Sequence, residues 1–296
     1  MKVLIAGATG LIGTEVAAQL RERGDEVVRL VRSASDGPDD IRWDPTLPLD
    51  PAVLDGVDAV INLAGASVGR IPWTPAYRRK LVDSRVTPTR TLVTAINAAA
   101  TPPAVLINGS AVGFYGDRGD EKLDEDSAAG TGFFPDLVAA WEAEAAKVRG
   151  ETRRVSIRTA VVVARGGAFT PMLLLTRLGL GSRFGRGTQT WPWISLHDEA
   201  AAIVHLLGSG LSGAINLAGP TPATSDEITR ELARQLHRWY LLRVPSFAIR
   251  LLLGEAGQRL LLDSADVVPS RLTSDGFRWR DETVAAAITR MLSARA

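Results

Sequence analysis

The chain has 296 residues, of which 46% are hydrophobic and 23% charged, a composition typical of one large globular domain or two small ones. Its net charge of +1 creates no strong field, so we expect neither a nucleic-acid nor a membrane partner. The absence of cysteine excludes disulfides, thiolate metal sites and a cysteine nucleophile, and the three scattered histidines predict no metal centre.

Strand and helix signals alternate along the first half of the chain. Short apolar runs predict strands at Lys2–Ala6, Glu26–Val31, Ala59–Leu63, Ala104–Gly109 and Arg154–Val163. Apolar residues spaced three and four apart predict helices at Leu11–Arg23, Pro75–Ala100 and Phe134–Val148. Strands separated by helices of this length indicate βαβ units, so we expect an α/β fold with a Rossmann-type, doubly wound parallel sheet.

The pattern changes near residue 164. Glycines crowd between Gly166 and Gly187, which predicts a flexible crossover, and later helices are expected at Ser225–Arg238, Ser246–Leu262 and Glu282–Leu292. We therefore interpret residues 1–165 as the sheet domain and residues 166–296 as a smaller, mainly helical C-terminal lobe that holds the substrate. A strand at Ala214–Ala218 either belongs to this lobe or rejoins the main sheet.

Two apolar segments bear on the location of the protein. The run after Met1 is short and is followed by glycines, so we expect a strand there and no signal peptide. The segment Phe247–Leu262 is interrupted by Arg250, Glu255 and Arg259, which favours a buried helix pair or a lid over a membrane span. Together with the lack of cysteine, these features predict a cytoplasmic protein.

A glycine motif follows the first predicted strand and opens the first predicted helix. Gly7 permits a tight turn, Gly10 lets the backbone approach a pyrophosphate, and Gly13 lets the helix pack closely on the strand. The helix start, with Thr9, Leu11 and Ile12, offers free N–H groups to the phosphates. The motif therefore predicts a dinucleotide site, the alternative being a plain glycine-rich turn.

The end of the second predicted strand decides which dinucleotide is bound. NAD-binding proteins usually place an acidic residue there to hold the ribose hydroxyls, whereas this chain has Arg32 and Ser33. Arg32 would neutralise a 2′-phosphate, and Ser33 could donate a hydrogen bond to it. We therefore expect NADP(H) as the cofactor, unless Arg32 is an ordinary surface arginine. The sheet domain is then the NADP-binding domain.

Further motifs resemble a known superfamily. Together with the glycine loop, Asn62-Leu63-Ala64-Gly65 and Ser110 followed by Tyr115-Gly116 resemble the extended short-chain dehydrogenase/reductases, the epimerase/dehydratase superfamily. More specific motifs resemble its atypical branch of "epimerase family proteins", which has a C-terminal extension of unknown function. These are Trp73 with Lys80, Ser84-Arg85, Ser110–Gly116, Trp141-Glu142 and Gly276–Trp279.

The resemblance implies a site in which one part is missing. In working members of the superfamily, a serine polarises the substrate oxygen and a tyrosine transfers the proton, helped by a lysine four residues later. Ser110 fits the serine, although it could instead be a loop serine that caps a turn. Alignment through Trp141-Glu142 puts Phe134 at the tyrosine position and Val138 at the lysine position. Phenylalanine transfers no proton and valine carries no charge, so the standard relay is absent.

Other residues are candidates for the missing roles. Tyr115 could face the same cleft as Ser110 and act as the acid, or be a packed aromatic. Leu63, Ala64 and Gly65 are expected to contact the cofactor. Lys80 and Arg85 on the following helix could bind a cofactor phosphate or an anionic substrate, or lie on a solvated helix face. Asn108 and Ser110 should share one face of their strand, because side chains alternate.

Two functions remain open at this point. The first is an NADP(H)-dependent oxidoreductase or epimerase-like enzyme, acting on a small carbonyl or sugar-type molecule bound between Ser110 and the C-terminal lobe. The second is a catalytically silent protein that senses NADP(H), which Phe134 and Val138 favour.

Overall fold

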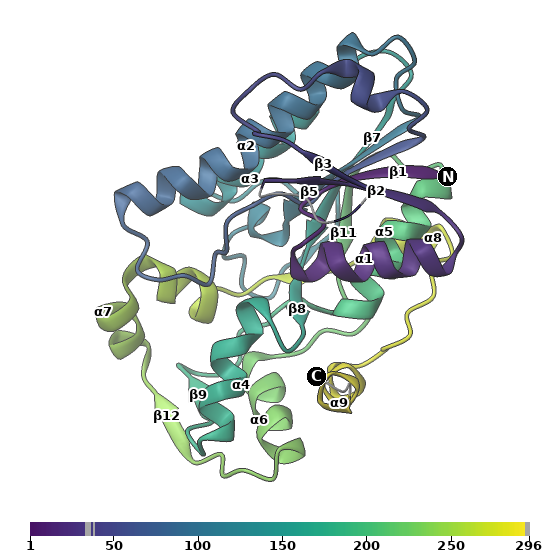
Figure 1. The fold of residues 1–296 in the computed structure, drawn as a ribbon. Coiled ribbons are helices and arrows are strands. Elements are labelled where there is room, and N and C mark those ends of the chain that lie inside the picture. The colour runs from purple at the N-terminus through teal and green to yellow at the C-terminus, as the bar shows by residue number, and fades with distance from the viewer. Residues whose placement is uncertain (33–36, 38, 294–296) are drawn as a thin grey trace.

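The computed structural model describes residues 1–32, 37 and 39–293. Within these residues the main sheet has seven parallel strands in the order β11-β7-β5-β4-β1-β2-β3 (Figure 1). Their bounds are β1 Lys2–Ala6, β2 Glu26–Val31, β3 Asp40–Arg42, β4 Ala59–Asn62, β5 Val105–Ala111, β7 Arg153–Thr159 and β11 Gly213–Leu217. The strand order reverses between β1 and β4, which confirms the expected doubly wound α/β fold.

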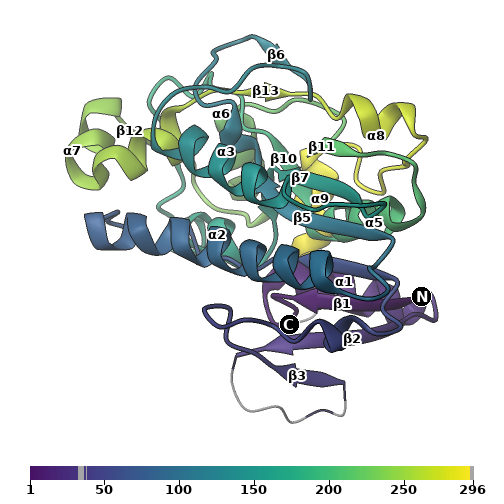
Figure 2. The same cartoon turned by 90° about the horizontal axis from the view of Figure 1, so that it is seen from above.

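Helices cover both faces of the sheet. Figures 1 and 2 show α1 (Leu11–Glu22) and α5 (Leu196–Gly208) on one face, and α2 (Pro75–Ala98) and α3 (Phe133–Ala145) on the other. Side-chain alternation in β1 explains the division, because the odd residues Val3 and Ile5 share a core with α1 and α5 whereas Leu4 shares a core with α2.

The strand predicted near residue 214 does rejoin the main sheet. Gly213 pairs with Val155, so β11 lies beside β7 at the sheet edge, and α5 directly before it packs on α1. The chain thus returns to the sheet domain after leaving it near residue 165. The domain boundary at that residue stays a prediction.

The C-terminal lobe lies below the sheet in Figure 1 and is held by its own apolar core. Its helices, together with α8 at the sheet edge, are α4 Thr170–Arg177, α6 Ser225–Gln235, α7 Ser246–Gly257, a π-helical turn Gln258–Leu262, α8 Ser270–Ser274 and α9 Val284–Ser293. Short strands pair as β8 Val161–Val163 with β10 Trp193–Ser195, β9 Ser182–Phe184 with β12 Leu242–Val244, and β6 Lys122–Leu123 with β13 Asp266–Val267. Single 3₁₀ turns occupy Pro51–Leu54, Val112–Phe114 and Gly167–Phe169.

The glycine-rich segment 166–187 is more than a crossover. It carries α4 and β9, and its glycines at 179, 185 and 187 have positive φ and form the turns beside them. Among the described residues, no helix combines the length and the apolar character that crossing a bilayer requires.

Candidate functional site

The glycine loop lies at the point where the strand order reverses. Gly7 has φ +83°, and the amide of Gly10 donates to its carbonyl oxygen over 3.0 Å, which closes a tight turn after β1. A Cβ on Gly7 would lie 2.7 Å from the carbonyl carbon and oxygen of Leu63. Only glycine therefore lets the loop after β1 pack against the loop after β4, at the edge where doubly wound sheets bind ligands.

The first turn of α1 leaves its amides unpaired by the helix. Gly10 occupies the N-cap without any side-chain hydrogen bond, and it is exposed together with Thr9. Amides in a first helical turn have no intrahelical acceptor and lie at the positive end of the helix dipole, so this turn, including Leu11 and Ile12, can bind a phosphate. A Cβ on Gly166 would lie 3.2 Å from Leu11 Cδ1, so the start of the C-terminal lobe lies over the same turn.

Arg32 directly follows β2, the strand next to β1 in the sheet, and is exposed. Its position at the carboxyl end of β2 is where a doubly wound fold recognises the ribose of a dinucleotide. Ser33, the second residue expected there, lies outside the described residues.

A buried polar network shapes the loop after β4. Asn62 Nδ2 donates to Thr89 Oγ1 over 2.9 Å and to Asn108 Oδ1 over 2.7 Å, and Asn62 Oδ1 accepts from the amide of Ala64 over 3.2 Å. This network holds Leu63 and Ala64 half-buried and leaves Gly65 exposed. The three residues can therefore border a cofactor with backbone rather than with polar side chains.

The structure brings Arg85 to this loop but not Lys80. The Arg85 guanidinium donates to the carbonyl oxygens of Leu81 and Ala66, each over 3.0 Å. Burial lowers the pKa of Arg85 to about 10, and none of the ion pairs among the described residues includes it. A cation in this position can attract an anionic group to the edge of the loop. Lys80 is exposed on the same helix, α2.

Ser110 is the last residue but one of β5, and its hydroxyl is already engaged. Its side chain is 5% exposed, and Oγ donates to Glu142 Oε1 over 2.6 Å. Arg158 holds the same carboxylate through Nε over 2.9 Å and Nη2 over 3.0 Å. Burial alone would lower the pKa of Arg158, but the pairing with Glu142 raises it overall. Ser110 thus ends a fixed Ser–Glu–Arg chain.

Tyr115 continues the same network into the core. Its ring is fully buried, and its hydroxyl accepts from Arg158 Nη1 over 2.9 Å and lies 2.7 Å from Asn216 Oδ1. Burial raises the pKa of this hydroxyl. The geometry gives Tyr115 the contacts of the packed aromatic that the sequence left open, rather than those of a proton donor at the sheet edge.

The position of the usual proton relay is filled by apolar side chains. Val138 is fully buried, and Phe134 lies edge-to-face on Trp73 with ring centroids 4.9 Å apart. Ala111 and Leu260 pack against the same cluster, the latter from the π-helical turn. Tyr77 belongs to the same cluster, and its hydroxyl donates to Ser67 O over 2.6 Å. Two guanidinium groups lie over rings at the border of the cluster, Arg78 at 5.1 Å from the centroid of Phe133 and Arg158 at 3.6 Å from that of Phe114.

The sequence named Glu142 only as part of a motif and assigned it no role. A signal was available, because Phe134, Val138 and Glu142 are four residues apart and therefore lie on one stripe of α3. The stripe passes from the aromatic cluster to Ser110, and its only charged member is Glu142.

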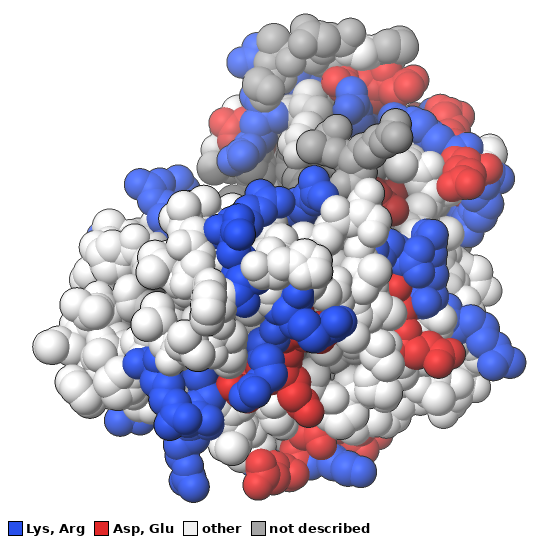
Figure 3. All heavy atoms as spheres, turned by 90° about the horizontal axis from the view of Figure 1, so that it is seen from below, with Lys and Arg blue, Asp and Glu red and all other residues white. Residues whose placement is uncertain are grey.

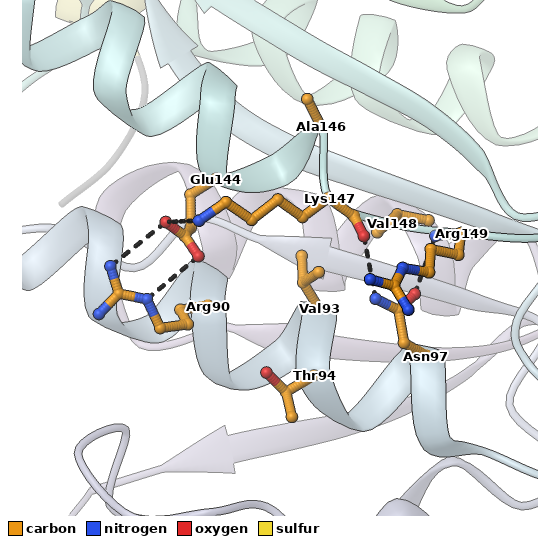
Figure 4. Close-up of a pocket in the computed structure, with 9 residues that line it drawn as sticks. All are labelled: Arg90, Val93, Thr94, Asn97, Glu144, Ala146, Lys147, Val148 and Arg149. Atoms are coloured by element: carbon orange, nitrogen blue, oxygen red, sulfur yellow. Dashed lines mark hydrogen bonds and ion pairs between the residues drawn. The ribbon is translucent and has the colours of Figure 1, made fainter.

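A separate pocket of about 390 Å³ lies between α2 and α3 (Figure 4). Arg90 and Lys147 both donate to Glu144 there, with Lys147 Nζ 2.9 Å from the carboxylate. Burial raises the pKa of Glu144, but these hydrogen bonds outweigh it and lower the pKa overall. The pocket lies at the C-terminal ends of the helices, which precede the amino ends of β5 and β7, so it is on the edge of the sheet opposite the glycine loop.

Comparison with known proteins agrees with this geometry. Residues 3–218 match the model of the NAD dependent epimerase/dehydratase family, and residues 244–291 match a domain of unknown function, DUF1731. The chain is 39% identical to the epimerase family protein Mb2239 of Mycobacterium bovis, over 97% of this chain and 96% of that protein.

Two solved structures are also similar. The crystal structure of human epimerase family protein SDR39U1 (isoform 2) with NADPH has a TM-score of 0.89 and 33% identity, covering 98% of this chain and 99% of that one. The nucleoside-diphosphate sugar epimerase of Corynebacterium glutamicum has a TM-score of 0.82 and 31% identity, covering 99% of this chain and 58% of that one. The chain is therefore a member of the NAD-dependent epimerase/dehydratase family, in the branch of the epimerase family proteins.

Proposed function

We propose that the protein binds NADP(H), with the diphosphate on the first turn of α1 and the 2′-phosphate beside Arg32. The observation that carries this proposal is the uncapped start of α1 at the strand reversal, with an exposed arginine and no acidic residue directly after β2. The NADPH in the structure of human SDR39U1 supports it. Leu63, Ala64 and Gly65 would contact the cofactor from the β4 side, and Arg85 is available for a further anionic group.

Replacing Arg32 by alanine is expected to remove the preference for NADPH over NADH. The loss of a charge-assisted contact to the 2′-phosphate should weaken NADPH binding about ten- to hundred-fold and leave NADH binding unchanged. Fluorescence titration with both nucleotides measures this, and Arg21→Ala, an exposed arginine in the last turn of α1, is the matched control. Equal affinities of the unmutated protein for NADPH and NADH would contradict the role given to Arg32.

We propose further that the protein is an NADP(H) sensor, which binds the cofactor but does not carry out the acid–base catalysis of its superfamily. The apolar side chains of Ala111, Phe134 and Val138 support this, because none of the three can donate or accept a proton. Ser110 and Tyr115 have their hydroxyls engaged in the buried network. A cytoplasmic location stays a prediction, and the protein would then sense the NADP(H) of the cytoplasm.

The sensor proposal is tested by restoring a proton donor at the position of the usual relay. The unmutated protein should bind NADPH but oxidise it no faster than solution controls with a panel of carbonyl compounds and nucleotide sugars. Phe134→Tyr, alone and with Val138→Lys, should gain turnover with a panel member while still binding NADPH. The single variant is the safer one, because Phe134 is half-buried whereas Val138 is fully buried.

One observation favours a second candidate, an oxidoreductase or epimerase-like enzyme acting on a small molecule. The chain from Ser110 through Glu142 to Arg158 could accept a proton from a substrate hydroxyl at Ser110. In that case the unmutated protein turns over, and Ser110→Ala slows turnover without abolishing NADPH binding. Turnover that survives Ser110→Ala unchanged would contradict this candidate, and any turnover by the unmutated protein would contradict the sensor.

A further inference from the structure

The C-terminal lobe exposes an unusual number of large apolar side chains. Of the thirteen exposed large hydrophobic residues among those described, ten lie in two segments, 174–180 and 239–252, which we call the apolar face. The exposed fractions reach 75% for Trp239, 72% for Phe247 and 81% for Leu251. Isolated exposed leucines are normal in a globular protein, but a concentration of this kind marks an interaction surface.

The two segments form one surface. Arg238 Nε donates to the carbonyl oxygen of Arg177 over 2.9 Å, which joins the chain before β12 to the end of α4. Ser182 then pairs with Leu242 in the β9–β12 ladder, and the amide of Gly185 donates to Val244 O over 2.9 Å. The face therefore runs from α4 along β12 to α7, which lies at the left edge of Figure 1.

The charged residues of the apolar face are arginines, and the nearest carboxylate on α7, Glu255, is paired with Arg78 and Arg259. Residues 170–184 and 236–254 contain five arginines and no aspartate or glutamate. Four of the arginines are exposed, namely Arg177, Arg238, Arg243 and Arg250. Asp226, which shares a pocket with Arg243, is held by Arg230 over 2.6 Å. Figure 3 shows a broad uncharged area on the left, the side of α7, with blue atoms at its border.

The helix α7 is built to lie on an apolar phase. Gly254, with φ +58°, breaks this helix. Before the break Ile249 is buried against the protein, whereas Phe247 and Leu251, four residues apart, form an outward stripe next to Arg250. A helix with aromatic and leucine residues outward and arginines beside them is typical of helices that lie in the interface of a membrane. A tryptophan such as Trp239 suits the same depth, because its ring is apolar and its N–H is polar.

We propose that the apolar face docks onto a lipid surface that carries anionic headgroups. A second copy of the chain is a poor occupant, because a two-fold interface sets the same patch against itself and would place arginines opposite arginines. An anionic bilayer instead supplies both the apolar phase and the counter-charge. The whole-chain charge of +1 predicted no membrane partner, but it averages over this local excess of arginine. The proposal is independent of cofactor binding.

Vesicle co-sedimentation tests it with the full chain. Binding to vesicles of phosphatidylcholine with phosphatidylglycerol should exceed binding to phosphatidylcholine alone by about ten-fold or more, and should fall as salt is raised. Arg238→Gln with Arg243→Gln should lose about five-fold per charge on the anionic vesicles only. Phe247→Ser with Leu251→Ser should lose binding to both kinds of vesicle, whereas Leu47→Ser, an exposed leucine of the sheet domain, should not.

Three results would overturn the proposal. They are no sedimentation with anionic vesicles at low salt, equal sedimentation of the Phe247/Leu251 variant, and a dimer in gel filtration that this variant abolishes. Unchanged NADPH titration and thermal melting of each variant would show that its fold is retained, because all the substituted side chains are exposed.

Discussion

Replacing Gly13 by alanine is expected to abolish NADPH binding and to destabilise the protein by about 3 kcal/mol. A Cβ at this position would lie 2.3 Å from the carbonyl oxygen of Gly7 and 2.8 Å from Cα of Ala8. Both neighbours are backbone, so no side chain can move aside and the start of α1 must shift. Such a shift removes the first-turn amides from the diphosphate, and we expect a loss of affinity of about 100-fold or more.

Substitutions at two other glycines separate the effect on NADPH binding from the effect on stability. Gly208 ends α5 and a Cβ there meets nothing within 4 Å, so Gly208→Ala should leave both binding and stability unchanged. A Cβ on Gly10 lies 3.2 Å from Gly7 O, a milder contact, so Gly10→Ala should weaken binding more than stability. Urea unfolding and NADPH titration measure the two effects. Binding by Gly13→Ala within about three-fold of the unmutated protein would refute the role given to this turn.

The main sheet was predictable because its strands are short apolar runs between helices. The sequence could not locate the break inside Arg154–Val163, which the structure divides into β7 and β8. β8 consists of three valines and β7 carries Val155 and Ile157, but β7 pairs with β5 whereas β8 pairs with β10 outside the main sheet. Local residue type carries no information about the pairing partner. β3 was missed for a different reason, because three residues give no periodic pattern.

The segment Phe247–Leu262 illustrates a different limit. Its apolar composition predicted a buried helix pair or a lid, yet the structure leaves Phe247, Leu251 and Leu252 exposed. The expectation of burial within the chain was wrong for these three side chains. Apolar sequence indicates that a surface favours leaving water, and it does not indicate whether the covering partner belongs to the same chain.

Some parts of the candidate site could be predicted from the sequence and others could not. The glycine loop could be predicted because each glycine meets a local requirement of the backbone. Alternation correctly placed Asn108 and Ser110 on one side of β5, since Asn108 contacts Thr89 of α2 and Ser110 contacts Glu142 of α3. Tyr115 was not placeable, because a 3₁₀ turn after β5 redirects the chain and sends its ring into the core.

The fully buried Glu199 is expected to make the protein less stable as the pH rises. Thr159 Oγ1 donates to Glu199 Oε1 over 2.7 Å, whereas Oε2 has no hydrogen-bond partner among the described residues. Burial raises the pKa of this carboxyl to about 8 from an ordinary value of 4.5. Between these values the folded protein keeps a proton that the unfolded chain has released, so the free energy of unfolding falls with rising pH. The decline is up to about 5 kcal/mol.

Glu199→Gln should remove this decline, because an amide stays neutral at every pH. The variant should be more stable than the unmutated protein near about pH 9, and the difference should vanish or reverse near about pH 5. Urea unfolding across that range measures it. Glu144→Gln is the opposite case, because the pKa of Glu144 is lowered in the folded protein. The contribution of Glu144 to the free energy of unfolding is therefore present above the ordinary carboxyl pKa and is lost only in acid. Parallel stability curves for Glu199→Gln and the unmutated protein would mean that Glu199 is already ionised in the folded state.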